Sequence, residues 1–211
     1  MSTAHLHTIE SKPLNKILNR IGNTPLIELD SFSSNRIRIF AKLEWEQLGG
    51  SVKARPAAFM IKDTLTSAPL KDGERLLEAT SGNTGIALAQ IAEQAGLPIT
   101  IILPKNAGRR RIELLEEAGA EIIFSSPLDE TDGAQILARQ LKDQHPGKYR
   151  FLDQYNNENN YRSHVLTTGP EIWKQTKGEV THFITGLGTS GSFRGITTYL
   201  KNRSVQIKSI A

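Results

Sequence analysis

The sequence contains no cysteine, and aromatic residues make up only 6% of its 211 positions. Without cysteine the chain can form no disulfide, no thiolate metal site and no cysteine nucleophile. No other metal-binding motif stands out, so no metal is expected. A chain without cysteine suits a reducing compartment, and we expect a cytoplasmic protein.

Long apolar runs are also missing. No stretch approaches the ~20 apolar residues of a membrane-spanning helix, and residues 1–12 lack the apolar core of a signal peptide. The formal net charge is +4, but basic and acidic residues are mostly interspersed, and the only dense basic run is 109–111. We therefore expect no membrane partner and no nucleic-acid partner.

Short apolar runs alternate with helical patterns from about residue 36 onward. Runs typical of β-strands lie at 36–43, 76–79, 99–103, 121–124, 182–184 and 204–211. Apolar residues at helical spacing predict helices over 86–95, 111–118 and 135–144. This alternation predicts an α/β fold with a mostly parallel sheet. Ligands of such folds bind in loops that follow strands.

The first such loop is GGSVKARP at residues 49–56. Its two glycines allow a tight turn before a predicted helix. Lys53 would lie at the positive end of that helix, which lowers the pKa of its amine and makes it a better nucleophile. Most lysines are ordinary surface residues, so this loop alone leaves both interpretations open.

Two further loops are rich in glycine and hydroxyl residues. The loop TSGNTG at 80–85 could receive a carboxylate or a phosphate, and helix capping explains only part of it. The loop GLGTSGS at 186–192 could bind phosphate oxygens or form a plain strand-to-helix turn. Its glycine spacing matches a dinucleotide motif, but no acidic residue follows Glu179 to bind a ribose.

The three loops fit one ligand pair better than three separate ligands. A lysine amine, a cradle for a carboxylate and a cradle for a phosphate describe pyridoxal phosphate together with an amino acid. The amine would hold the aldehyde as a Schiff base, and the phosphate would dock at a helix N-terminus.

Five segments occur in a family-like order: IGNTPL at 21–26, GSVK at 50–53, TSGNTG at 80–85, TTGPEI at 167–172 and GLGTSGS at 186–192. Together they resemble the cysteine synthase and cystathionine β-synthase family of fold-type II pyridoxal-phosphate enzymes. The resemblance runs from about residue 14 to residue 211. It is closest to the branch that contains cysteine synthase B and O-phosphoserine sulfhydrylase.

The resemblance implies a role for each matched residue. Lys53 would be the catalytic residue, forming an aldimine with pyridoxal phosphate and then acting as the base on the substrate α-carbon. The cofactor would also contact Asn83, Gly188, Thr189, Ser190, Gly191 and Ser192, the last five through its phosphate. The substrate carboxylate would contact Thr80, Ser81, Gly82, Thr84 and Gln154.

The implied reaction is a β-replacement. An activated serine, O-acetylserine or O-phosphoserine, would give an aminoacrylate that accepts sulfide or another sulfur donor. A serine or threonine dehydratase or a cystathionine β-synthase is the enzymatic alternative. A non-enzymatic interpretation is an inactive fragment that serves as a binding module, and a nucleotide-binding domain would leave Lys53 unexplained. The family resemblance also implies a homodimer.

The implied fold has two αβα lobes with mostly parallel sheets. Residues 1–45 would join the larger lobe, 46–157 would form the smaller lobe, and 158–211 would form an incomplete, cofactor-binding larger lobe. Family members are roughly half as long again, as two full domains require. We therefore expect a C-terminally truncated chain that is weakly active or inactive alone.

Several positions depart from the family pattern. Ala54 stands where an aspartate usually follows the lysine, and Gln47-Leu48 replaces a usual Asn-Pro. The segment NNENN at 156–160 replaces Asn-Pro-Ala-Asn, and Val165 stands where an aromatic is common after His164. These changes are expected to loosen the region around Gln154.

Overall fold

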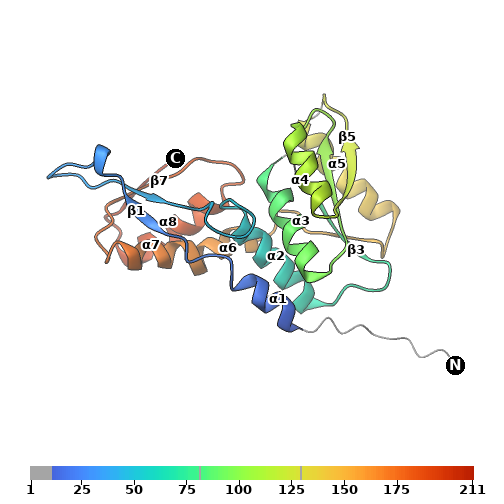
Figure 1. Ribbon diagram of the computed structural model, residues 1–211, viewed down its shortest axis with the longest axis horizontal. Coiled ribbons are helices and arrows are strands. Elements are labelled where there is room, and N and C mark those ends of the chain that lie inside the picture. The colour runs from blue at the N-terminus through green and yellow to red at the C-terminus, as the bar shows by residue number, and fades with distance from the viewer. Residues whose placement is uncertain (1–10, 81, 129) are drawn as a thin grey trace.

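The computed structural model describes residues 11–80, 82–128 and 130–211 (Figure 1). Its largest sheet has four strands in the order β5–β4–β3–β6. These strands are β3 (Arg75–Ala79), β4 (Ile99–Pro104), β5 (Glu121–Ser125) and β6 (Tyr149–Phe151). Every pairing in this sheet is parallel. The predicted α/β fold with a mostly parallel sheet is confirmed.

Helices cover both faces of this sheet, because successive side chains of a strand point to opposite sides. The helices are α2 (Ala54–Ser67), α3 (Asn83–Ala95), α4 (Arg109–Glu117) and α5 (Glu130–Gln144). Leu76 and Ile101 lie in one core with apolar residues of α2, α3 and α4. Leu77 and Ile102 lie in a second core with residues of α5. The result is a three-layer αβα arrangement.

A second, two-stranded parallel sheet pairs β7 (His182–Ile184) with β8 (Lys208–Ile210). Helix α8 (Gly191–Arg203) connects the two strands. Its residues Ile196 and Leu200 form a small core with Ile172 and Ile207. Ile184 is 70% exposed, so within the described residues this sheet carries its apolar core on one face.

The remaining elements are a third, two-stranded sheet and several short helices. Strands β1 (Leu26–Glu28) and β2 (Phe40–Lys42) pair antiparallel, with a short 3-10 helix, η1 (Asp30–Phe32), between them. The remaining helices are α1 (Ser11–Leu18), α6 (Asn159–Ser163), the π-helix η2 (His164–Thr168) and α7 (Gly169–Gln175). Helix α2 packs against both α3 and α6, and it occupies the middle of the molecule in Figure 1.

Two predicted strands are shorter than expected. The run at 36–43 forms a strand only at β2, and the run at 204–211 forms one only at β8. Residues 204–207 instead turn back on α8, where the Ser204 amide donates to the Leu200 carbonyl and the Ile207 amide to the Ser204 carbonyl. The division into lobes at 45/46 and 157/158 stays a prediction. No helix in the described ranges has the length and apolar character that crossing a membrane requires.

Candidate functional site

Lys53 lies at the start of α2, directly after a tight turn. Gly49 and Gly50 both adopt positive φ angles, 90° and 58°, which glycine tolerates best. The Lys53 side chain is half-buried, and this desolvation lowers the pKa of its amine. A Cβ atom placed on Gly188 would lie 3.9 Å from Lys53 Nζ. The structure therefore brings the lysine amine beside the 186–192 loop.

The 186–192 loop joins β7 to the N-terminus of α8. Ser190, the residue before the helix, has a left-handed φ of 61°. Gly188 and Ser190 are exposed, whereas Gly191 is buried. A Cβ on Gly191 would lie 2.1 Å from Asn160 Oδ1, so only glycine fits at this position. The first-turn amides of α8 are a suitable environment for a phosphate.

The 80–85 loop lies at the C-terminal end of β3 and the start of α3. Thr80 and Thr84 are buried, and Thr80 Oγ1 accepts a hydrogen bond of 3.2 Å from the Gly82 amide. Asn83 begins α3 and is exposed. Ser81 lies outside the described residues. The loop therefore presents small polar groups at a helix N-terminus, as its sequence predicts.

Gln154 joins the 80–85 loop to the segment after β6. Its Oε1 accepts a hydrogen bond of 2.8 Å from Thr84 Oγ1. Its Nε2 donates to Ala79 O at 3.2 Å and to Glu78 Oε1 at 3.3 Å. Gln154 is 4% exposed. The predicted substrate-carboxylate residues Thr84 and Gln154 are therefore in direct contact.

Glu78 is a buried carboxyl group behind the 80–85 loop that the loop motifs did not predict. It belongs to β3, is 1% exposed, and accepts hydrogen bonds from the backbone amides of Ala79 and Gln154. Burial raises the pKa of Glu78 to about 8. An acidic residue inside an otherwise apolar strand was the one sequence signal for it. Glu78 holds Gln154 in place from behind the loop.

Asn160 connects the Gln154 segment with the 186–192 loop. Its Nδ2 donates to Gln154 O and to Thr189 Oγ1, both at 2.8 Å. Asn156 and Asn157 add hydrogen bonds to Asp153 and to the Leu152 carbonyl. These asparagines tie the 156–160 segment to its neighbours, and the expectation that the departures from the family pattern loosen the region around Gln154 stays a prediction.

A buried charged cluster lies next to the lysine turn and combines three of the sequence motifs. Arg55, two residues after Lys53, is 1% exposed and pairs with Glu44 and Glu171 at 2.7 Å each. Lys42 also contacts Glu171, at 2.7 Å. Burial alone would raise the pKa of Glu171, but hydrogen bonds from Arg55 and Lys42 lower it to about 2. The cluster fastens α2 to α7.

Residues of the IGNTPL motif form hydrogen bonds with the charged cluster. Gln47, which departs from the family pattern, forms hydrogen bonds with that motif and with the lysine turn. The Asn23 amide donates to Glu171 at 2.9 Å, and Thr24 Oγ1 donates to Glu44 at 2.6 Å. Gln47 accepts from the Gly22 amide at 2.9 Å and donates to the Ser51 carbonyl at 3.2 Å. The glutamine in place of the usual Asn-Pro therefore ties the IGNTPL motif to the lysine turn.

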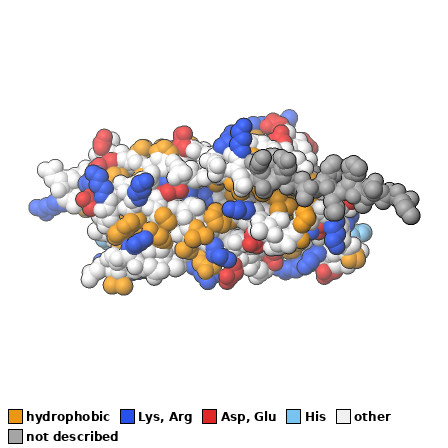
Figure 2. Space-filling view, turned by 90° about the horizontal axis from the view of Figure 1, so that it is seen from below, with side chains coloured by type: hydrophobic (Ala, Val, Ile, Leu, Met, Phe, Trp, Pro, Cys, Tyr) orange, Lys and Arg blue, Asp and Glu red, His pale blue; other side chains and the backbone are white. Residues whose placement is uncertain are grey.

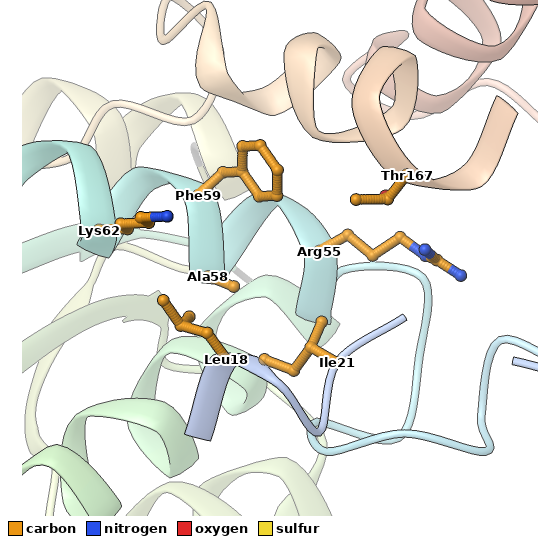
Figure 3. Close-up of a pocket in the computed structure, with 7 residues that line it drawn as sticks. All are labelled: Leu18, Ile21, Arg55, Ala58, Phe59, Lys62 and Thr167. Atoms are coloured by element: carbon orange, nitrogen blue, oxygen red, sulfur yellow. The ribbon is translucent and has the colours of Figure 1, made fainter. Parts of the chain in front are cut away.

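A separate cavity of about 130 Å³ contains none of the predicted site residues. Its lining residues are Leu18, Ile21, Arg55, Ala58, Phe59, Lys62 and Thr167 (Figure 3). The Arg55 guanidinium points away from Leu18 and Phe59. This mostly apolar cavity has no glycine-rich anion cradle, and we do not assign the candidate site to it.

Comparison with known proteins agrees with the arrangement of the loops. Residues 17–211 match the family described as "Pyridoxal-phosphate dependent enzyme". The chain is 43% identical over 197 residues to a cysteine synthase of Aquifex aeolicus, covering 90% of this chain and 60% of that protein. It is 40% identical over 191 residues to cysteine synthase B of Salmonella typhimurium, covering 90% and 62%.

A solved structure gives the same result. The O-acetyl serine sulfhydrylase isoform 3 of Entamoeba histolytica superposes with a TM-score of 0.83 at 34% identity. The match covers 91% of this chain and 58% of that one. The chain thus spans about 60% of the length of these two cysteine synthases.

Proposed function

We propose that this chain, which belongs to the pyridoxal-phosphate dependent enzyme family, is part of an enzyme that makes cysteine from an activated serine. The observation that carries the proposal is the half-buried Lys53 amine beside Gly188. A lysine amine with a lowered pKa can bind an aldehyde, and the glycine-rich helix N-terminus beside it can bind a phosphate. Pyridoxal phosphate carries both groups.

The residues present fit pyridoxal phosphate. Lys53 Nζ would attach the aldehyde, and the exposed start of α8 would receive the phosphate. The residues proposed to hold the cofactor besides Lys53 are Asn83, Gly188, Thr189, Ser190, Gly191 and Ser192. Bound pyridoxal phosphate would supply an electron sink for loss of the substrate α-proton.

The protein's own groups would bind and orient the amino acid. Thr80, Gly82, Thr84 and Gln154 would hold its carboxylate, with Ser81 as a further proposed contact. Lys53 Nζ would take the proton from the α-carbon, a role for which a lowered amine pKa is suited. The desolvated position of Lys53 keeps that amine neutral for a larger fraction of the time.

The finer substrate assignment rests on the relatives. Two relatives are named cysteine synthases, and one solved structure is an O-acetyl serine sulfhydrylase. We therefore propose O-acetylserine or O-phosphoserine as the substrate class and sulfide or another sulfur donor as the acceptor. The cysteine synthase B branch, the two-lobe division and a cytoplasmic location belong to the same proposal.

Assembly as a homodimer is also part of the proposal. Apolar side chains gather along the middle of the face shown in Figure 2. Leu166, on the π-helix η2, is 59% exposed. Apolar side chains that gather on one face of a protein support an interface there.

Covalent trapping tests the proposed function. Purified protein is incubated with pyridoxal phosphate, reduced with borohydride and digested, and the labelled peptide is identified by mass spectrometry. We expect the label on Lys53, and we expect Lys53→Ala to abolish it. Lys62→Ala, a change at an exposed lysine of the same helix, should leave labelling intact. Label on another lysine of the wild-type protein would refute the assignment.

A further inference from the structure

Asn160 lies between the two halves of the candidate site. It is the second residue of α6 and is 6% exposed. Its Nδ2 donates hydrogen bonds of 2.8 Å to the backbone carbonyl of Gln154 and to Thr189 Oγ1. Gln154 belongs to the proposed carboxylate side, and Thr189 to the proposed phosphate side. One buried amide therefore touches both.

The direction of these hydrogen bonds follows from the chemistry of the partners. A backbone carbonyl can only accept, so the Asn160 atom facing Gln154 O must be the amide nitrogen. The nitrogen has two hydrogens, and the two contacts use both. Thr189 Oγ1 therefore accepts from Asn160, and its own hydrogen stays available for another acceptor.

The other end of the Asn160 amide sets the position of the loop. Asn160 Oδ1 is buried, has no hydrogen-bond partner among the described residues, and lies where a Cβ of residue 191 would be. Gly191 is the first residue of α8. The side chain of Asn160 thus lies directly under the turn that carries Thr189 and Ser190.

We propose that Asn160 is a positioning residue that makes the Thr189 hydroxyl a hydrogen-bond donor toward the cofactor phosphate. By accepting from Asn160, Thr189 Oγ1 is left with its hydrogen free for an anion above the loop. The same amide holds the Gln154 backbone, so it fixes the phosphate loop and the carboxylate segment in one arrangement. This inference rests on the proposed function.

The test compares two cofactor forms that differ only in the phosphate. Absorbance titrations give the affinity of the protein for pyridoxal phosphate and for pyridoxal, which has the aldehyde but no phosphate. For Asn160→Ala we expect pyridoxal phosphate affinity to fall roughly 10-fold or more, as for loss of one hydrogen bond to a charged group. Pyridoxal affinity should change little. Asn202→Ala, which removes an exposed amide on α8, should change neither.

A double variant separates positioning from general loosening. Thr189→Val should cause a similar loss for pyridoxal phosphate, and adding Asn160→Ala to it should cause little further loss, because both changes remove the same donated hydrogen bond. Equal losses for pyridoxal and pyridoxal phosphate in Asn160→Ala, or additive losses in the double variant, would overturn the inference.

Folding of the variants is checked by circular dichroism. If Asn160→Ala does not fold, Asn160→Ser, with a single hydroxyl hydrogen, takes its place in the same comparison. Wild-type protein that binds neither pyridoxal nor pyridoxal phosphate would refute the proposed function itself. Wild-type protein that binds pyridoxal phosphate through Lys53 while Asn160→Ala or Asn160→Ser keeps the phosphate preference would refute only the role of Asn160.

Discussion

Glu171 is a half-buried glutamate and Glu78 a buried one, and their surroundings shift their pKa values in opposite directions. Glu171 accepts hydrogen bonds from Arg55 and Lys42, and these cations lower its pKa to about 2. Glu78 receives only amide hydrogens from Ala79 and Gln154 among the contacts described, and burial raises its pKa to about 8. Burial raises the pKa of both carboxyls, and only at Glu171 do cationic partners reverse that shift.

The two glutamates therefore have different structural roles. The charged cluster around Arg55 joins α2, β2 and α7, which hold the lysine turn in place. Glu78, whose pKa burial raises, supports Gln154 and the 80–85 loop. A neutral carboxyl there would add no full negative charge beside a proposed carboxylate site. Two carboxylates in close proximity would repel each other.

Removing Arg55 should have the largest effect on stability. Arg55→Met would leave Glu44 and Glu171 half-buried, with Lys42 as their remaining nearby cation. Breaking a buried ion pair in this way costs about 3–5 kcal/mol. Urea denaturation at neutral pH measures the free energy of unfolding. Arg111→Met, at an exposed arginine of α4, is the control. A loss below about 1 kcal/mol for Arg55→Met would show that the cluster does not stabilise the fold.

Replacing Glu78 should change how stability depends on pH. The folded-state pKa of Glu78 is raised from 4.5 to about 8, so between these values the folded protein keeps a proton that the unfolded chain has released. Wild-type stability from this group is therefore complete below about pH 4.5 and is lost as pH rises through 8. Glu78→Gln should remove this loss, which is about 1.4 kcal/mol per pH unit inside the window.

The measurement is a series of urea titrations from pH 5 to pH 8, run on the wild type, Glu78→Gln and the exposed control Glu116→Gln. The difference between the wild type and Glu78→Gln should grow with pH, and the control should follow the wild type. Parallel curves for the wild type and Glu78→Gln would mean that Glu78 is ionised in the folded protein, like Glu171.

Thr24→Val should have the smallest effect of the three. Thr24 is 1% exposed, and its hydroxyl donates to Glu44 while accepting from Lys42 and Arg55. Valine has the same shape but leaves these groups one partner short, which costs about 1–3 kcal/mol. Urea denaturation again measures the loss, with the exposed Thr66→Val as the control. A loss as large as that of Arg55→Met would mean that the hydroxyl, not the charge pairing, holds the cluster together.

The sequence was most informative where a pattern repeats locally. The sequence predicted β3, β4 and β5 from apolar runs, and α3 and α5 from helical spacing. Each of these patterns depends only on residues within one element, so it can be recognised from the sequence alone. Strands β1 and β6 have three residues each and were missed. A strand of three residues shows little alternation, and its pairing partner lies elsewhere in the chain; β7, of the same length, was predicted as a short apolar run at 182–184.

The same limit applies to the candidate site. The glycine turns at Lys53 and Ser190 were recognisable because glycine and hydroxyl residues mark such loops locally. The role of Asn160 was not recognisable, because its hydrogen bond to Thr189 joins residues 29 positions apart. Arg55 was visible only as part of a motif. Its burial with Glu44 and Glu171 depends on the packing of α7 against the start of the chain.

The π-helix η2 sets the rotational phase of the helical stretch that contains both Asn160 and Glu171. A π-turn carries one more residue than the α-helical turn it interrupts. If His164–Thr168 kept all five residues but wound as an α-helix, α7 would turn by roughly 100° relative to α6, the rotation of one α-helical residue. Glu171 would then face away from Arg55 while Asn160 stayed under the 186–192 loop. The wider π-turn of η2 thus accommodates one extra residue while α6 and α7 keep the relative orientation that both contacts need.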